Sequence, residues 1–226
     1  MEASYPPEVT TEWIGTATST PDGPKRFHVQ YELVGPLLFL ILFTCLANVV
    51  VILCILIHRP LQKPNNYFVI SLAVADALVG LIVMTGMLVY TIYGLWPLSD
   101  GLCTAWIVSD FASCTVSMIH LCLIAHDRYL ALAKPLQYRH AHRTRIISTN
   151  ICLTWIVGIL AWMPAIIWFR INQEPVEYDC LFIPDKLYTL IQAIVVYYAP
   201  IVMMLIFYIQ CLLGLRAQYH KINAAL

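Results

Sequence analysis

The stretch CTAWIVSDFASCTVSMIHLCLIAHDRY, from Cys103 to Tyr129, is apolar and long enough to cross a bilayer, yet it carries an aspartate near one end and an Asp-Arg pair at the other. An α-helix rises about 1.5 Å per residue, so Asp110 and Arg128 lie on one face, about 27 Å from each other. A carboxylate at membrane depth is unfavourable by on the order of 2.5–3.5 kcal/mol, and such residues usually mark a ligand, ion or proton site. The stretch therefore predicts a helix that joins a cation site to a switch on the other side of the membrane.

Apolar residues make up 60% of the 226 residues and charged residues 12%, against roughly 45–50% and 25% in globular domains. This composition predicts an all-α integral membrane protein. Uncharged or nearly uncharged runs of about twenty residues predict five transmembrane helices, at about 33–57, 65–93, 101–133, 146–169 and 187–215.

These runs divide the chain into three parts. We expect a transmembrane domain at 31–215, and the start of a third cytoplasmic loop at 216–226. Residues 1–30 are rich in Pro, Thr and Ser and are expected to form a flexible tail.

Basic residues follow the first, third and fifth apolar runs, whereas the opposite loops are mainly acidic. Short cytoplasmic loops are enriched in Lys and Arg, so we expect a multi-pass plasma-membrane protein with an extracellular N-terminus. Cys103 and Cys180 are the two cysteines at the extracellular ends of the runs. Because that compartment is oxidising, we predict a disulfide between them; two free thiols are the alternative.

Asp76 lies close to the middle of the second run. A buried carboxylate needs a cation, a partner or a proton. Ser117, seven residues after Asp110 and nearly on the same face, can supply a hydroxyl, and Asn48 of the first run can supply an amide. Two interpretations stay open: an oxygen-lined Na⁺ site, and a protonated, hydrogen-bonded Asp76.

Asp110 lies about two turns inside the extracellular end of its run, and the runs offer it no Lys or Arg partner. A ligand ammonium group about 4 Å away would gain roughly 4 kcal/mol at an effective dielectric constant of about 20. Asp110 is therefore predicted to be the counter-ion of a cationic ligand. Aromatic rings can add cation–π contacts, although ordinary packing explains any single ring as well; the candidates are Trp106, Phe111, Trp162 and Tyr197.

At the cytoplasmic end, Asp127 can pair with its neighbour Arg128 until a partner displaces the acid, which predicts an electrostatic latch. The alternative is an arginine that only anchors the interface. Leu136 beside Pro135 forms an apolar knob on a basic loop. It suits a protein partner with an apolar pocket and an acidic rim, although basic clusters also bind anionic lipid.

Two prolines interrupt the later runs. Pro164 is expected to end or bend the fourth helix. Pro200 removes a backbone hydrogen bond near the centre of the fifth helix and predicts a hinge there.

Together these residues resemble the rhodopsin-like (class A) G protein-coupled receptors from about Tyr31 to Arg216. The resemblance rests on Asn48, Leu72-Ala73-x-x-Asp76, Cys103, Asp127-Arg128-Tyr129, Trp155, Cys180, and Pro200 with Tyr208. Within the aminergic subgroup, the chain is most similar to muscarinic acetylcholine and histamine receptors. The pieces are Asn65-Asn66-Tyr67-Phe68, Trp106-x-x-x-Asp110, Pro135-Leu136-x-Tyr138-Arg139 and Trp162-x-Pro164-Ala165-Ile166.

The resemblance implies a seven-helix receptor bundle, of which five transmembrane helices are present, and no enzymatic activity. The implied ligand is a protonated biogenic amine, bound by Asp110, Trp106, Phe111, Cys114, Trp162, Phe182, Gln192 and Val196. An allosteric Na⁺ is implied at Asp76, Ser117 and Asn48, with no other cofactor. Coupling to a heterotrimeric G protein is implied for Asp127, Arg128, Tyr129, Pro135, Leu136 and Tyr208.

Membrane lipid and a receptor dimer are further partners that we consider, and no nucleic acid is expected. A second hypothesis is a truncated five-helix receptor form that does not signal and modulates the full-length receptor by association. A transporter or channel would need repeats or several lumen-facing charges, and the sequence shows neither.

Overall fold

The computed structural model describes residues 31–133, 143–172, 180, 182, 184 and 186–225, and these residues form helices and no strands. Five helical segments are long and apolar enough to cross a bilayer. The prediction of an all-α membrane fold with five spans is therefore confirmed. The tail at 1–30 lies outside the described residues.

The first span is α1, Tyr31–Ile57, which is followed by a short 3-10 turn, η1, Arg59–Leu61. The second span consists of α2, Asn66–Leu78, a π-helical turn η2, Val79–Met84, and α3, Thr85–Tyr93. The third and fourth spans are single helices, α4, Asp100–Ala133, and α6, Arg143–Asn172. The fifth consists of α7, Lys186–Gln192, a π-helical turn η3, Ala193–Tyr198, and α8, Ala199–Ala225.

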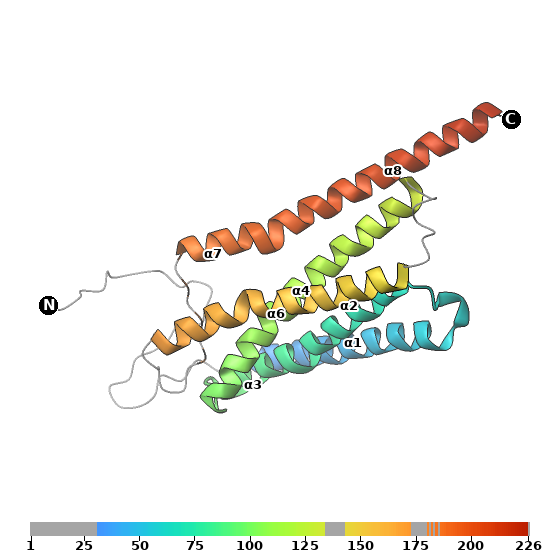
Figure 1. The fold of residues 1–226 in the computed structure, drawn as a ribbon. Helices are drawn as coiled ribbons and strands as arrows, with labels where there is room; N and C mark the ends of the chain where they lie inside the picture. Colours follow the sequence, from blue (N-terminus) through green and yellow to red (C-terminus); the bar gives the residue numbers. More distant parts are fainter. Residues whose placement is uncertain are drawn as a thin grey trace, which may run out of the picture.

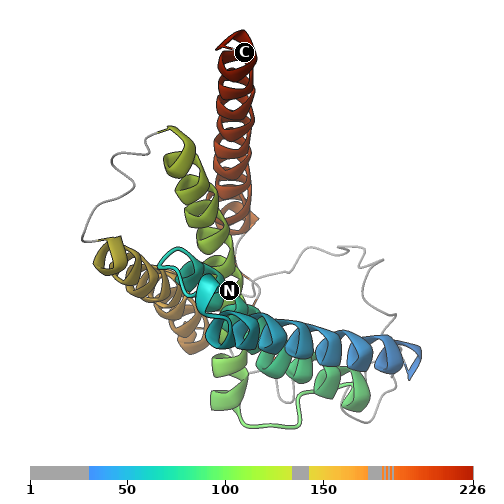
Figure 2. The ribbon, with the colours of Figure 1, turned by 90° about the vertical axis from the view of Figure 1, so that its right-hand side faces the viewer.

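Helix α4 is the centre of the bundle and packs against α2, α6 and α8. Figure 2 shows α4 between α6 on one side and the group of α1, α2 and α3 on the other. Consecutive spans run in opposite directions (Figure 1). We call the end where α3 and α6 finish and α4 and α7 begin the disulfide end. The other end, where α1 and α4 finish and α6 begins, is the opposite end.

Several hydroxyl side chains inside these apolar helices are satisfied by their own helix. Thr91, Thr104, Ser109 and Thr154 each donate a hydrogen bond to the backbone carbonyl four residues earlier, at 2.7–3.1 Å. This back-bonding gives these four hydroxyl hydrogens a partner, and an unsatisfied polar group in hydrocarbon is unfavourable. The sequence can therefore hold hydroxyls in membrane spans without interrupting the helices.

A small residue lets α4 and α6 approach closely. A Cβ atom added to Gly158 of α6 would meet Val116 Cγ2 at 2.5 Å and the Ala112 carbonyl oxygen at 3.3 Å. Helices in a membrane associate through such close contacts, because lipid tails are as apolar as the side chains. Gly158 therefore sets where the central helix meets the fourth span.

Neither proline interrupts its helix, whereas a bend at Pro164 and a hinge at Pro200 stay predictions. Helix α6 continues through Pro164 to Asn172, so Pro164 does not end it. The fifth span also continues past Pro200, and the wide turn η3 lies directly before that proline. A proline lacks the N–H group and crowds the preceding turn, and a π-helical turn accommodates this without breaking the helix.

The end of the fifth span differs from the expected boundary. Helix α8 continues to Ala225, about three turns beyond the expected end at 215, because residues 215–225 contain no Gly or Pro.

The π-helical turn η2 inside the second span was not predicted. The carbonyls of this widened turn gain partners from Thr85, which donates to the Gly80 oxygen at 3.2 Å, and from the Trp106 indole, which donates to the Val83 oxygen at 3.0 Å.

Candidate functional site

The disulfide end is closed by a covalent link between the central helix and the segment before the fifth span. Cys103 and Cys180 form a disulfide with their Cα atoms 5.7 Å apart, so the predicted pairing is confirmed. An ion pair between Asp100 and Arg170 also joins the start of α4 to the end of α6. These links fix the mouth of the bundle.

An aromatic cluster lies below this disulfide. Its buried members include Trp96 and Trp162, and Phe111, Phe182 and Val196 pack against it. Phe182 makes an edge-on contact with Phe111, with ring centroids 5.6 Å apart. Phe182, two positions after Cys180, is therefore held against the aromatic cluster.

Trp106 is tightly held by its neighbours. Its ring stacks on Trp96 at 5.0 Å between centroids, and its N–H bonds to the carbonyl of Val83. A Cβ atom added to Gly86 would collide with the Trp106 indole. Trp106 is therefore a rigid wall of the site, with one ring face already covered.

Trp162 is one of the most deeply buried side chains among the described residues. It is 1% exposed, stacks on Phe111 at 4.5 Å between centroids, and donates a 2.7 Å hydrogen bond to the hydroxyl of Thr115. Phe111 therefore lies against the ring of Trp162. Thr115, which the sequence analysis did not single out, satisfies the indole and so fixes the base of the aromatic wall.

Asp110 is half-buried on α4 beside this wall. Its neighbour is Cys114, whose thiol lies 3.8 Å from the Asp110 Oδ1 atom, one turn along the helix. Among the described residues, no Lys or Arg pairs with Asp110; the two ion pairs there are Asp100–Arg170 and Asp127–Arg143. The carboxylate therefore lacks a cation within the described part of the chain, although it lies in a helix long and apolar enough to cross a membrane.

Three side chains of the fifth span are of interest here: Gln192, Val196 and Tyr197. Gln192 donates a 2.6 Å hydrogen bond to the Tyr188 hydroxyl, and Val196 packs against the aromatic cluster. Tyr197, which the sequence suggested only as an aromatic ring, is half-buried.

Asp76 lies further inside the bundle. Ser117 donates a 2.7 Å hydrogen bond from α4 to the Asp76 Oδ1 atom of α2, the contact that their positions suggested. Asn48 instead donates to the Thr44 carbonyl of its own helix at 2.9 Å. The structure therefore joins two of the three residues suggested for an ion site. Within the described residues, no group of three or more His, Cys, Asp or Glu side chains could hold a metal ion.

His120 is a buried polar residue that the sequence analysis did not single out. It is fully buried, its Nδ1 atom lies 2.8 Å from the Val116 carbonyl oxygen, and its ring meets Phe68 edge-on. The Nδ1 atom must carry the proton to bond a carbonyl, so Nε2 is an acceptor. That acceptor has no partner in the described part of the chain.

The opposite end carries the main correction to the sequence analysis. Asp127 forms an ion pair with Arg143 of α6, and Arg143 also bonds Asn65 at the start of α2 at 2.8 Å. Asp127 is buried whereas its neighbour Arg128 is exposed. Adjacent residues on a helix point about 100° apart and do not face each other, so the expected Asp127–Arg128 latch is replaced by a pair between helices.

Tyr129 and Tyr208 occupy different environments at this end. Tyr129 stacks on Phe207 of α8 with centroids 5.9 Å apart, and His126 contacts the same ring. Tyr208 is exposed. Pro135 and Leu136 lie outside the described residues.

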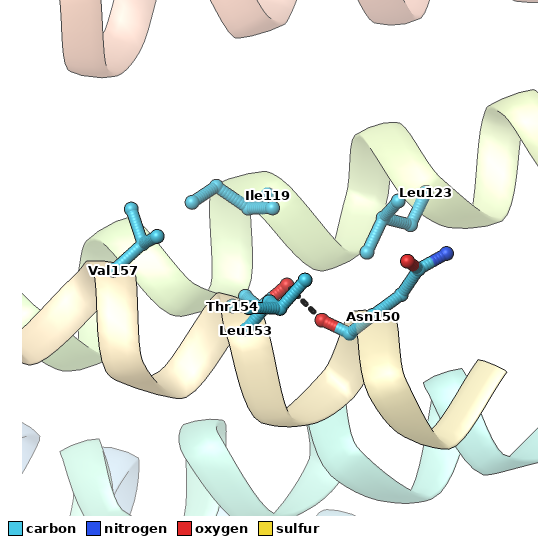
Figure 3. Close-up of a pocket in the computed structure, with 6 residues that line it drawn as sticks. All are labelled: Ile119, Leu123, Asn150, Leu153, Thr154 and Val157. Atoms are coloured by element: carbon cyan, nitrogen blue, oxygen red, sulfur yellow. Dashed lines mark hydrogen bonds between the residues drawn. The ribbon is translucent and has the colours of Figure 1, made fainter. Parts of the chain in front are cut away.

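A shallow groove runs between α4 and α6 on the outer side of the bundle (Figure 3). Its walls are apolar apart from the Asn150 amide and the Thr154 hydroxyl, which bonds the Asn150 carbonyl. Leu153 and Val157 are exposed there. This groove is separate from Asp110 and carries no charged side chain. The candidate site is therefore Asp110 with the aromatic residues beside it.

Residues 47–224 match the sequence model of a family described as "7 transmembrane receptor (rhodopsin family)". The chain belongs to this family. Its rhodopsin-family relatives include muscarinic acetylcholine receptor M4 from Gallus gallus, 35% identical over 80% of this chain and 38% of the relative. The 5-hydroxytryptamine receptor 1B from Spalax ehrenbergi is 36% identical over 78% of this chain and 46% of the relative. The human 5-hydroxytryptamine receptor 1D is 33% identical over 85% of this chain and 52% of the relative.

The resemblance to aminergic members of the rhodopsin family is therefore confirmed, and serotonin receptors join the muscarinic ones at the same level of identity. Because these relatives are receptors, the prediction that the chain is not an enzyme is also confirmed. The chain spans 38–52% of the length of these three relatives.

Proposed function

We propose that this chain is the part of a class A receptor that binds a protonated amine at Asp110 and transmits binding to a heterotrimeric G protein. The relatives are receptors named for acetylcholine and 5-hydroxytryptamine, both of which carry a cationic nitrogen. The proposal places the disulfide end outside the cell, and it takes the plasma membrane as the location.

The observation that carries this proposal is the state of Asp110. It is half-buried at membrane depth, its neighbour is a thiol, and the described residues bring no Lys or Arg to it. An ammonium group in contact with the Asp110 carboxylate would gain on the order of 4 kcal/mol of electrostatic attraction at an effective dielectric constant of about 20. This gain offsets the unfavourable free energy of burying the carboxylate. Phe111 and Trp106 then border the cation with ring surface, since cations bind well over aromatic faces.

Transmission is proposed to run along α4, since the same helix carries Asp110 and, at the opposite end, Asp127, Arg128 and Tyr129. The exposed Arg128 guanidinium would meet the G protein, while Asp127 is held by Arg143. Tyr129 contacts Phe207 of α8, so a displacement of the fifth span would reach the same surface.

A sodium ion is proposed as an allosteric ligand of Asp76 and Ser117. Both residues offer oxygen atoms, which are the ligands that hard cations prefer, and their side chains already meet at 2.7 Å. Asn48 is directed to its own helix, so it is a weaker candidate for this site.

The test is competition binding of an amine panel to membranes from cells that express the native gene. Asp110→Asn keeps the size of the side chain and removes the charge, so affinity for every amine that binds should fall roughly 100- to 1,000-fold, as a loss of about 3–4 kcal/mol requires. Asp100→Asn is the matched control, because Asp100 lies on the same helix but is exposed and paired with Arg170. Equal affinities for the wild type and Asp110→Asn would remove the amine-receptor proposal.

A further inference from the structure

The groove between α4 and α6 begins at a tight contact between the two helices. At Gly158, the α6 backbone lies directly against Val116 of α4. From that contact the helices separate towards the opposite end of the bundle (Figure 1), and the groove lies between them. Its lining residues are Ile119, Leu123, Asn150, Leu153, Thr154 and Val157. The groove therefore extends from the middle of the bundle towards the opposite end.

Asn150 carries the polar group of the groove whose hydrogen-bonding capacity is unused. Its amide extends from α6 towards Leu123 of α4 (Figure 3), and it makes no hydrogen bond with any other described residue. The hydroxyl of Thr154 is already bonded to the Asn150 carbonyl at 2.8 Å. An amide without a partner in hydrocarbon is unfavourable. The Asn150 amide therefore indicates a ligand that supplies a hydrogen-bonding group.

The depth of Asn150 in the bilayer follows from the charges that flank the fourth span. Residues 146–169 are uncharged and lie between Arg145 and Arg170. They extend about 36 Å at about 1.5 Å per residue, slightly more than the hydrocarbon core of about 30 Å. Asn150 is near the start of this run, so its amide lies close to the boundary between hydrocarbon and headgroups. From there to Val157, the groove extends about 10 Å towards the middle of the bilayer.

We propose that this groove binds a membrane sterol, whose hydroxyl is hydrogen-bonded to the Asn150 amide and whose rings lie along α6 as far as Val157. The inference goes beyond the proposed function and does not depend on the ligand of Asp110. A sterol carries one hydroxyl at one end of a rigid, flat, apolar ring system. In a bilayer, the hydroxyl lies at the headgroup boundary and the rings point inwards, which is the polarity of the groove. The site does not include Trp155, whose indole donates to Ser71 of α2 at 3.0 Å.

Other membrane lipids match this groove less well. A phospholipid headgroup carries charge, whereas none of the described lining residues is charged. An acyl chain has no hydrogen-bonding group to offer the Asn150 amide. The β-branched side chains of Ile119, Thr154 and Val157 have few rotamers, so these walls lose little entropy when a rigid ligand binds. A rigid lipid with a single hydroxyl therefore fits best.

The experiment is photo-crosslinking with a sterol that carries a diazirine and an alkyne, in membranes from cells that express the native gene. Mass spectrometry identifies the labelled peptides, and labelling is expressed per molecule of the protein. We expect labels at the α4 and α6 residues of the groove, and excess cholesterol should suppress them. Epicholesterol differs from cholesterol only in the configuration of the hydroxyl and should suppress them less, because its hydroxyl meets the amide at a different angle.

Two variants alter the groove in different ways. Asn150→Leu removes the amide and nearly keeps the size of the side chain, so labelling of the groove should fall about fivefold. Val157→Phe fills the apolar end of the groove and should reduce labelling at least tenfold. The matched controls are Thr149→Leu and Ile156→Phe, at exposed positions of α6 that do not line the groove. Both controls should be labelled as the wild type is.

Three results would overturn the inference. The first is labelling spread evenly over the exposed faces of the helices, and the second is unchanged labelling in both Asn150→Leu and Val157→Phe. The third is labelling of the groove by a photoactivatable phosphatidylcholine that cholesterol does not displace, since the occupant would then be an acyl chain. No amine enters this measurement, so a failed sterol site and a failed amine-receptor proposal are told apart directly.

Discussion

Arg143, the first residue of α6, forms an ion pair with Asp127 of α4 and a hydrogen bond with Asn65 before α2. One guanidinium group thus holds three spans together at the opposite end of the bundle. The pair also satisfies the carboxylate beside Arg128, so Arg128 does not depend on that neighbour and stays exposed. Arg143 therefore has a direct role in stability and an indirect one in the surface that Arg128 presents.

Replacing Arg143 tests the first of these roles. Arg143→Gln leaves the buried Asp127 carboxylate without its charged partner, which destabilises the fold by roughly 1–3 kcal/mol. The apparent melting temperature of the purified chain in detergent should fall, by roughly 2–4 °C per kcal/mol. Arg145→Gln, two residues further along and exposed, should leave it unchanged. Identical melting of the two variants would contradict a stabilising pair, and partial recovery in the charge-swapped Asp127→Arg, Arg143→Asp double variant would support it.

His120 gives a prediction of opposite sign. Its Nε2 atom is buried without a partner in the described part of the chain, and such an atom carries a desolvation penalty of about 1–3 kcal/mol. His120→Phe removes this acceptor while keeping a ring against Phe68. The melting temperature should therefore rise. His120→Asn keeps a buried polar group and should lower the melting temperature. A fall of the same size in both variants would show that the Nε2 atom of His120 has a hydrogen-bond partner in the membrane.

Gly158 tests the packing of the central helix. Gly158→Ala places a methyl group against Val116 and the Ala112 carbonyl, and overpacking of this kind destabilises by typically 1–3 kcal/mol. Thermal unfolding in detergent measures the change. Gly214→Ala in α8 is the control, because no atom lies within 4 Å of its added Cβ, and alanine is favoured over glycine in a helix by about 1 kcal/mol. Equal losses at both positions would point to a cause other than the α4–α6 contact.

Much of the fold and part of the site were predictable from the sequence. Length and apolarity determine membrane helices, because only a helix satisfies its own backbone groups in lipid. The pairing of Cys103 with Cys180 followed from their location at one end of the spans. The Ser117–Asp76 contact could be suggested because a carboxylate at membrane depth needs a polar partner on a neighbouring helix.

The parts that were not predicted depend on how helices lie against each other. Nothing in the local pattern around Arg143 indicates that it reaches Asp127 rather than solvent. The burial of Trp162 behind Phe111 likewise depends on the rotation of α6 against α4. The turn η2 has no proline to signal it, since its carbonyls find partners in Thr85 and in a tryptophan from another helix. A periodic pattern identifies the apolar face of a helix but not its angle to a neighbour.

The disulfide also has a consequence for biosynthesis. Cys103 and Cys180 are separated by 77 positions, and most of α4 and all of α6 lie between them. The two thiols can meet only when the chain has crossed the bilayer twice and returned to the side from which it started, and only in a compartment that oxidises thiols. Closure of this bond therefore reports that both crossings between the two cysteines have been made.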